Sequence, residues 1–135
     1  MIVVDTNVIA YLYLSGDRSS QAEQALLRDS EWAAPLLWRS EMRGVLSLYI
    51  RRKQLTLAEA QQVMAEATRL MRDREYAVTS EQVLTLIASS ACSAYDCEFV
   101  ALAADLHVRL VTTDRQILGE YPDAAVSLDD YAAGR

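Results

Sequence analysis

The sequence has few of the residues on which the commonest catalytic sites depend. Its 135 residues include one histidine, His107, and two cysteines, Cys92 and Cys97. Because His107 stands alone, we expect neither a histidine-rich metal site nor a Ser-His-Asp triad. The cysteine spacing fits neither a CxxC redox pair nor a zinc knuckle, so both are predicted to be buried free thiols.

Glycine, proline and long apolar runs are also scarce. The four glycines and two prolines leave no stretch that resembles a flexible linker. The longest uncharged run, residues 82–95, is shorter than the roughly 20 residues of a membrane-spanning helix. No basic region precedes the apolar start at Ile2, as a secretory signal would require. We therefore expect a single domain over residues 1–135, located in the cytoplasm, with no membrane span.

Positive charge is in the minority, and it is almost all arginine. The net charge is −6, and Lys53 is the only lysine. This balance at first disfavours a nucleic-acid partner, because phosphate binding normally brings a basic excess. If several carboxylates hold a metal ion, however, the remaining charge is nearly balanced, and arginine suits forked contacts with phosphate.

Short apolar strands alternate with amphipathic helices along the chain. Strands are predicted at 2–4, 32–34, 76–78, 109–112 and 125–128, with helices between them. Capping boxes that begin at Ser20, Thr56 and Thr79 predict three of the helix starts. The helices at 36–53 and 56–73 are expected to form an antiparallel hairpin. This order predicts a three-layer α/β/α sandwich with a central, mostly parallel sheet.

Four acidic residues occupy positions where such a fold gathers its ligands. Asp5 and Asp114 follow predicted strands, and ligands bind at the carboxyl ends of parallel strands. Glu41 lies four residues from both Leu37 and Val45, which together with Leu48 form the predicted inner face of its helix. A buried carboxylate is costly unless it is paired or binds metal. These three acids are therefore predicted to share one pocket.

Asp96 completes the set, because it lies three residues before Phe99 on an apolar helix stripe. Four carboxylates without histidine or cysteine make an all-oxygen site, which favours Mg²⁺ or Mn²⁺ over zinc. Such a site can activate a bound water and stabilise the oxygens of a phosphodiester during hydrolysis. The sequence therefore predicts metal-dependent phosphodiester chemistry.

Each acid also has a simpler explanation when it is taken alone. The two strand-end acids can cap the helices that follow them. Asp96 can form a capping box with Ser93. Glu41 can pair with Arg39 or Arg43 on its own helix. The metal site is favoured by the convergence of all four acids with no lysine nearby.

Taken in order, these motifs resemble the PIN-domain ribonucleases and, among them, the VapC-like toxins of toxin–antitoxin modules. Four segments carry the similarity: residues 2–7, 40–41, 95–103 and 111–114. The resemblance implies a Mg²⁺- or Mn²⁺-dependent endoribonuclease that forms a homodimer and is held inactive by a small VapB-like antitoxin. Arg115 and Gln116 stand where some relatives have a further acid, so the number of metal ions stays open.

The resemblance also implies roles for particular residues. Thr112 and Asn7 would support the metal ligands, which would be Asp5, Glu41, Asp96 and Asp114. The weaker candidates for binding the RNA substrate are Asn7, Arg39, Arg43 and Arg115, and the arginines would contact its backbone.

Three other functions can be weighed against this one. The first is a non-catalytic PIN-like module, whose acids bind metal for stability or dock an arginine-rich partner tail. The second is a housekeeping PIN nuclease in RNA processing. A phosphatase or phospho-receiver domain is disfavoured, because Asp5 lacks the second Asp of a DxDxT motif and no lysine follows a late strand.

Overall fold

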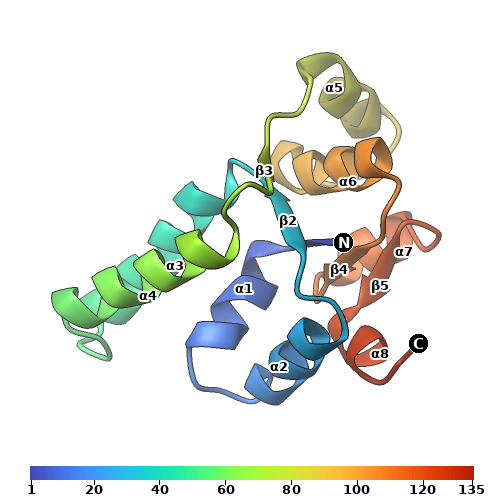
Figure 1. Ribbon diagram of the computed structural model, residues 1–135. Coiled ribbons are helices and arrows are strands. Elements are labelled where there is room, and N and C mark those ends of the chain that lie inside the picture. Colours follow the sequence, from blue (N-terminus) through green and yellow to red (C-terminus); the bar gives the residue numbers. More distant parts are fainter.

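The computed structural model describes all 135 residues, in which eight helices surround one five-stranded sheet (Figure 1). The sheet has the order β3-β2-β1-β4-β5, and all neighbouring strands are parallel. The strands are β1 (Ile2–Val4), β2 (Trp32–Pro35), β3 (Glu75–Tyr76), β4 (Leu110–Thr112) and β5 (Ala125–Ser127). The predicted α/β sandwich with a mostly parallel sheet is confirmed, and the observed sheet is parallel throughout.

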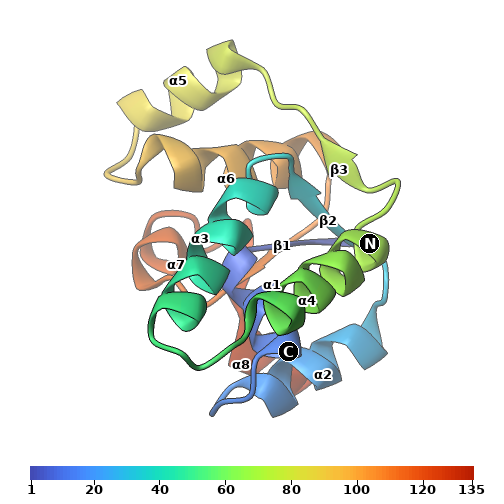
Figure 2. The same cartoon turned by 90° about the vertical axis from the view of Figure 1, so that its left-hand side faces the viewer.

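The helices form the outer layers of the sandwich. Helix α6 packs across β1, β2 and β4, and α5 lies on its outer side, while α1, α2 and α8 cover the other face (Figure 1). Figure 2 shows α3 and α4 side by side as the predicted antiparallel hairpin. The helices are α1 (Thr6–Tyr13), α2 (Ser19–Arg28), α3 (Trp38–Arg51), α4 (Leu57–Leu70), α5 (Ser80–Ala88), α6 (Ala94–Leu106), α7 (Arg115–Glu120) and α8 (Leu128–Ala132).

Local capping explains some helix starts and corrects one prediction. Thr56 and Glu59 form the predicted capping box, in which each side chain accepts a hydrogen bond from the other's backbone N–H. The box predicted at Ser20 is wrong, because α2 already begins at Ser19 and has no side-chain cap. The Ser19 hydroxyl instead donates to the backbone oxygen of Leu14, which closes the turn before the helix.

The chain ends in a short helix that its sequence pattern does not predict. The hydroxyl of Ser127, the last residue of β5, accepts a hydrogen bond from the N–H of Asp130 and so caps α8. Tyr131 of this helix is buried, and the Arg28 guanidinium lies 4.5 Å from its ring centroid. A contact between residues so distant in the chain anchors α8 on α2.

The hydrophobic core fills both sides of the sheet. Val3, Val4 and Val111 are fully buried, as expected for parallel strands that are covered on both faces. The free thiols Cys92 and Cys97 are buried, as predicted. No helix combines the length and apolar character needed to cross a membrane.

Candidate active site

The candidate site lies where the strand order of the sheet reverses. The chain runs outward from β1 through β2 to β3, and then returns to β4 on the opposite side of β1. At such a switch point, the connections that follow two adjacent parallel strands run in opposite directions. This leaves a crevice at the carboxyl ends of the two strands. Asp5 follows β1 and Asp114 follows β4, and the Asp5 N–H donates to the Val111 oxygen over 3.0 Å. The topology thus brings the two strand-end acids to one place.

Asp5 is the most buried of the four acids, with 8% of its surface exposed. One carboxylate oxygen accepts a hydrogen bond from the Thr6 N–H at 2.8 Å, so Asp5 caps α1 as the simpler explanation predicted. The other oxygen accepts from the Thr112 hydroxyl at 2.7 Å. Burial raises the pKa of Asp5, and the Thr112 hydrogen bond partly opposes this effect. The second bond goes beyond what a helix cap requires, and it fixes the direction of the carboxylate.

Thr112 connects the two strand-end acids. Its side chain is fully buried, and its hydroxyl donates to Asp5 while it accepts a hydrogen bond from the Asp114 N–H at 3.0 Å. Asp114 caps α7, because one of its carboxylate oxygens accepts from the Ile117 N–H at 3.0 Å. The second oxygen of Asp114 has no hydrogen-bond partner within the protein, so it is available to a ligand.

Glu41 comes from α3, but the buried face of this helix differs from the predicted one. The inner face of α3 is formed by Trp38, Met42 and Leu46, whereas Leu48 is 48% exposed. The predicted inner face was therefore misplaced by about one residue, because α3 packs against α1 and α4 along the row of Met42. Glu41 lies at the border of that face and is half-buried.

A threonine holds Glu41 in place. The buried Thr6 hydroxyl donates to a Glu41 carboxylate oxygen over 2.8 Å. Burial raises the pKa of Glu41, and the nearby Asp5 and Asp96 raise it further. The simpler explanation for Glu41, an ion pair with Arg39 or Arg43, is wrong, because neither arginine pairs with it.

Asp96 lies in the first turn of α6 and is half-buried. The Ser93 hydroxyl accepts a hydrogen bond from the Asp96 N–H at 3.1 Å, so Ser93 caps the helix. Burial raises the pKa of Asp96, and the charge of Asp114 adds to this effect. The middle of helix α6 is largely buried because it lies between the sheet and α5, and Asp96 in its first turn is close enough to Asp114 for the two charges to interact.

The four acids repel one another and lack a basic partner. None of them takes part in an ion pair of the structure. They do not form a closed cage, since no three potential ligands lie close enough together to hold a metal ion by themselves. The donors nevertheless fit Mg²⁺ or Mn²⁺ in their chemistry, because these ions prefer carboxylate oxygens and usually keep several waters or bind substrate phosphate. The arrangement is an open, oxygen-lined site.

Two residues of this neighbourhood were not predicted. Thr6 supports Glu41, and its position between Asp5 and Asn7 was the only signal for it. Glu98 is half-buried with a raised pKa caused by burial, and its charge raises the pKa of Glu41. A helical pattern places Glu98 on a different face from Asp96, so periodicity could not identify it.

The weaker candidate residues differ in whether their side chains are already paired within the protein. The Arg39 guanidinium binds Glu75 of β3 through two hydrogen bonds, of 2.5 Å and 2.6 Å, so it is engaged away from the acids. Arg43 and Arg115 are exposed and form no ion pair. Asn7 is exposed in the first turn of α1, at the rim of a cavity.

Sequence and structure comparisons place this chain in a known family. The family profile described as PIN domain matches residues 2–122. Ribonuclease VapC3 from Pyrobaculum aerophilum is 31% identical over 124 residues, which cover 90% of this chain and 95% of that protein. The chain belongs to the PIN-domain family.

Solved structures show the same fold at low sequence identity. PAE2754 from Pyrobaculum aerophilum has a TM-score of 0.78 and 16% identity, with 98% of this chain and 94% of that chain covered. A toxin–antitoxin complex from Klebsiella pneumoniae (TM-score 0.70, 20% identity) and FitAcB from Neisseria gonorrhoeae (0.69, 19%) each cover 95% of this chain and 98% of their own.

Proposed function

We propose that the protein is a metal-dependent endoribonuclease that hydrolyses RNA phosphodiester bonds and serves as the toxin of a toxin–antitoxin module. One observation supports the proposal: in a PIN domain, four acidic side chains near the switch point of the sheet interact through their charges, and none of them has a basic partner. The name of the relative, Ribonuclease VapC3, supports RNA as the substrate.

In this proposal the ligands of Mg²⁺ or Mn²⁺ are Asp5, Glu41, Asp96 and Asp114. When bound, the ion would activate a water molecule and stabilise the charge that develops on the phosphate. The protein's own contribution is to hold the acids in position. Thr112 orients Asp5, and Thr6 orients Glu41. The exposed Arg43 and Arg115 would contact the RNA backbone, as would Asn7 from the start of α1.

The proposal includes partners and a location. Solved neighbours include a toxin–antitoxin complex, which supports a small VapB-like antitoxin as the partner of this chain. We further propose that residues 1–135 act as one nuclease domain, that it forms a homodimer, and that it works in the cytoplasm, where RNA is accessible.

Cleavage of RNA by purified protein tests the proposal. We expect cleavage in Mg²⁺ or Mn²⁺, none in EDTA, and a loss of at least about 100-fold in Asp5→Asn and Glu41→Gln, because a metal ion supplies several kcal/mol of transition-state stabilisation. Asp105→Asn is a matched control, since Asp105 is exposed on α6. Unchanged cleavage in both site variants would falsify the site.

Expression in cells tests the toxin role separately. The wild-type protein should arrest growth, and co-expression of the product of a short neighbouring gene should relieve the arrest. Cleavage of RNA without growth arrest would favour the housekeeping nuclease. Metal binding without any cleavage would favour the non-catalytic module.

A further inference from the structure

We propose that the cavity between α1, the α1–α2 loop and α3 binds one unpaired nucleobase of the RNA, next to the phosphate held at the acids. The inference rests on the proposed function, since it assigns part of the substrate to a second place on the protein. It assigns base recognition to Tyr11, Tyr49 and Arg18, which no step of the chemistry described above requires.

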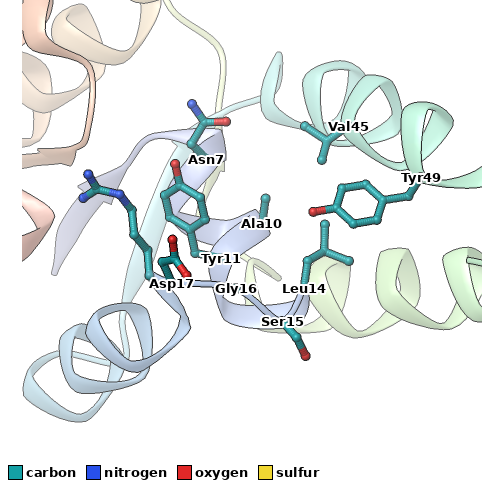
Figure 3. Close-up of a pocket in the computed structure, with 10 residues that line it drawn as sticks. Asn7, Ala10, Tyr11, Leu14, Ser15, Gly16, Asp17, Val45 and Tyr49 are labelled. Atoms are coloured by element: carbon teal, nitrogen blue, oxygen red, sulfur yellow. The ribbon is translucent and has the colours of Figure 1, made fainter. Parts of the chain in front are cut away.

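The cavity has a volume of about 290 Å³. This volume lies just below the usual range for ligand pockets, about 300 to 1,000 Å³, and therefore suits one planar ring system better than a large ligand. In Figure 3 the rings of Tyr11 and Tyr49 lie on opposite sides of Ala10. Leu14 and Val45 complete the apolar part of the wall.

The position of the cavity relative to the acids follows from helix α1. Asp5 caps this helix, and Asn7 in its first turn lies at the rim of the cavity. Tyr11 is six residues beyond Asp5, about 9 Å along the helix axis. An RNA strand with a phosphate at Asp5 can therefore extend along α1 and place a neighbouring base in the cavity.

The chemistry of the lining suits a base better than an aliphatic side chain. Aromatic side chains stack on bases of any sequence, because every base has a π-face. Neither the Tyr11 hydroxyl nor the Tyr49 hydroxyl makes a hydrogen bond within the protein, so both are free to contact a base edge. Half of the lining residues are polar or glycine, and they include Asn7 and Asp17, whose side chains offer donors and acceptors.

Arg18 supplies the charge that a nucleotide requires. It lines the cavity, and its only ion pair is a 3.7 Å contact with Asp129 in which both side chains are substantially exposed. Exposed pairs of this kind contribute little stability, so a phosphate can replace Asp129 at small cost. An arginine that lines the same cavity as two aromatic rings matches a nucleotide, which carries both an anion and a π-surface.

The experiment compares two RNA probes that differ only in their bases. One is a fluorescein-labelled uridine dodecamer, and the other is a dodecamer of abasic ribose phosphates with the same length and charge. Binding is measured by fluorescence anisotropy in Ca²⁺ instead of Mg²⁺, and gel analysis after each titration verifies that the RNA is intact. The proteins are the wild type, Tyr49→Leu, Tyr11→Leu, and the matched control Tyr49→Phe, which keeps the ring.

We expect each leucine variant to bind the uridine probe roughly 5- to 150-fold more weakly than the wild type, as expected for the loss of one stacking contact. Binding of the abasic probe should not change, and Tyr49→Phe should resemble the wild type with both probes. Val45→Phe keeps both tyrosines but fills the cavity, so it should also weaken binding of the uridine probe alone. Circular dichroism verifies that each variant is folded.

Four results would overturn the inference in distinguishable ways. Equal losses with both probes would mean that the rings support the backbone path rather than a base. Unchanged RNA binding together with lost antitoxin binding would mean that the cavity holds a side chain of the protein partner. If the wild type neither binds nor cleaves RNA, the proposed function fails together with the subsite, whereas cleavage without any difference between the probes removes the subsite alone.

Discussion

At the scale of single residues, two threonines determine how the acids are held. Thr112 bonds to Asp5 and to the backbone of Asp114, and Thr6 bonds to Glu41. Both threonines are buried, so their hydroxyls have no competing water. A buried hydroxyl that donates to a carboxylate restricts the rotation of that carboxylate and stabilises its negative charge. Such supporting contacts tune a metal site nearly as much as its ligands do.

Replacement of Thr112 by valine tests this support. Thr112→Val keeps the shape but removes the hydroxyl, which leaves an Asp5 oxygen and the Asp114 N–H without their partner. We expect a loss of about 1 to 3 kcal/mol in the free energy of unfolding and a fall of roughly 10- to 100-fold in metal affinity. Urea denaturation and calorimetric titration with Mn²⁺ measure the two effects. Thr112→Ser keeps the hydroxyl and should restore metal affinity, and equal affinity in all three proteins would contradict the role.

The ion pair between Arg39 and Glu75 predicts a pH dependence of stability. The hydrogen bonds from Arg39 hold the pKa of Glu75 below its ordinary value of 4.5, although burial acts in the opposite direction. Because the folded-state pKa is lowered, the stabilisation is complete above the unfolded-state pKa and is lost as the pH falls through the folded-state pKa. Glu75→Gln should therefore destabilise the protein at neutral pH, and the difference from wild type should shrink below pH 4.5.

Urea denaturation across this pH range measures the difference. Glu23→Gln is the control, since Glu23 is exposed on α2 and takes part in no ion pair. A Glu75→Gln deficit that stays constant down to the most acidic pH would show that the pair contributes through packing alone.

At the scale of elements, α3 shows how a small error in helical phase changes the interpretation of a site. The row formed by Leu37, Glu41, Val45 and Leu48 and the row formed by Trp38, Met42 and Leu46 differ by about one residue, or about 100° around the axis. Both rows are largely apolar, so periodicity alone does not choose between them. Packing against α1 and α4 selects the second row and leaves Glu41 at its border, where a carboxylate can reach both the core and a ligand.

Two truncations on α3 test this assignment. Met42→Ala removes a fully buried side chain and should lower the free energy of unfolding by about 2 to 5 kcal/mol. Leu48→Ala removes a side chain that is 48% exposed, and its effect should stay within roughly 0.5 kcal/mol. Thermal or urea denaturation compares the two variants. If Leu48→Ala were the more destabilising change, the assignment of Trp38, Met42 and Leu46 to the buried face of α3 would be wrong.

At the scale of the whole molecule, the acidic side chains of the site repel one another, and a bound cation would reduce this repulsion. Burial and mutual charge raise the pKa values of Asp5, Glu41 and Asp96. A raised folded-state pKa means that these acids destabilise the metal-free protein as the pH rises through their pKa values. A divalent cation that binds only the folded protein should therefore stabilise it, and more so at higher pH.

Melting temperature with and without metal measures this coupling. We expect Mn²⁺ at 100 times its dissociation constant to add about 2.7 kcal/mol of stability to the wild type. The gain should diminish in acidic buffer, because protonated acids cannot bind the ion. Glu41→Gln should lose most of the gain, whereas Asp105→Asn should keep it. A melting temperature that does not respond to Mn²⁺ or Mg²⁺ at neutral pH would contradict metal binding.

The sequence by itself determined the features that depend on neighbouring residues in the chain. The alternation of strands and helices predicted the α/β class, and the Thr56 capping box depends on a span of four residues. The strand-end positions of Asp5 and Asp114 followed from a topological rule, so they too could be predicted. The strand, helix and capping signals are local, because one stretch of sequence contains all the groups that interact in each of them.

Only the tertiary structure decided the features that join distant residues. The Arg39–Glu75 pair connects residues 36 positions apart in the chain, and the Thr6–Glu41 hydrogen bond connects residues 35 positions apart. Neither contact leaves a periodic pattern in the sequence. The same holds for the cavity between Tyr11 and Tyr49, whose two rings come from α1 and α3. The physical reason is that partner choice among many similar side chains depends on which surfaces the packed helices bring into contact.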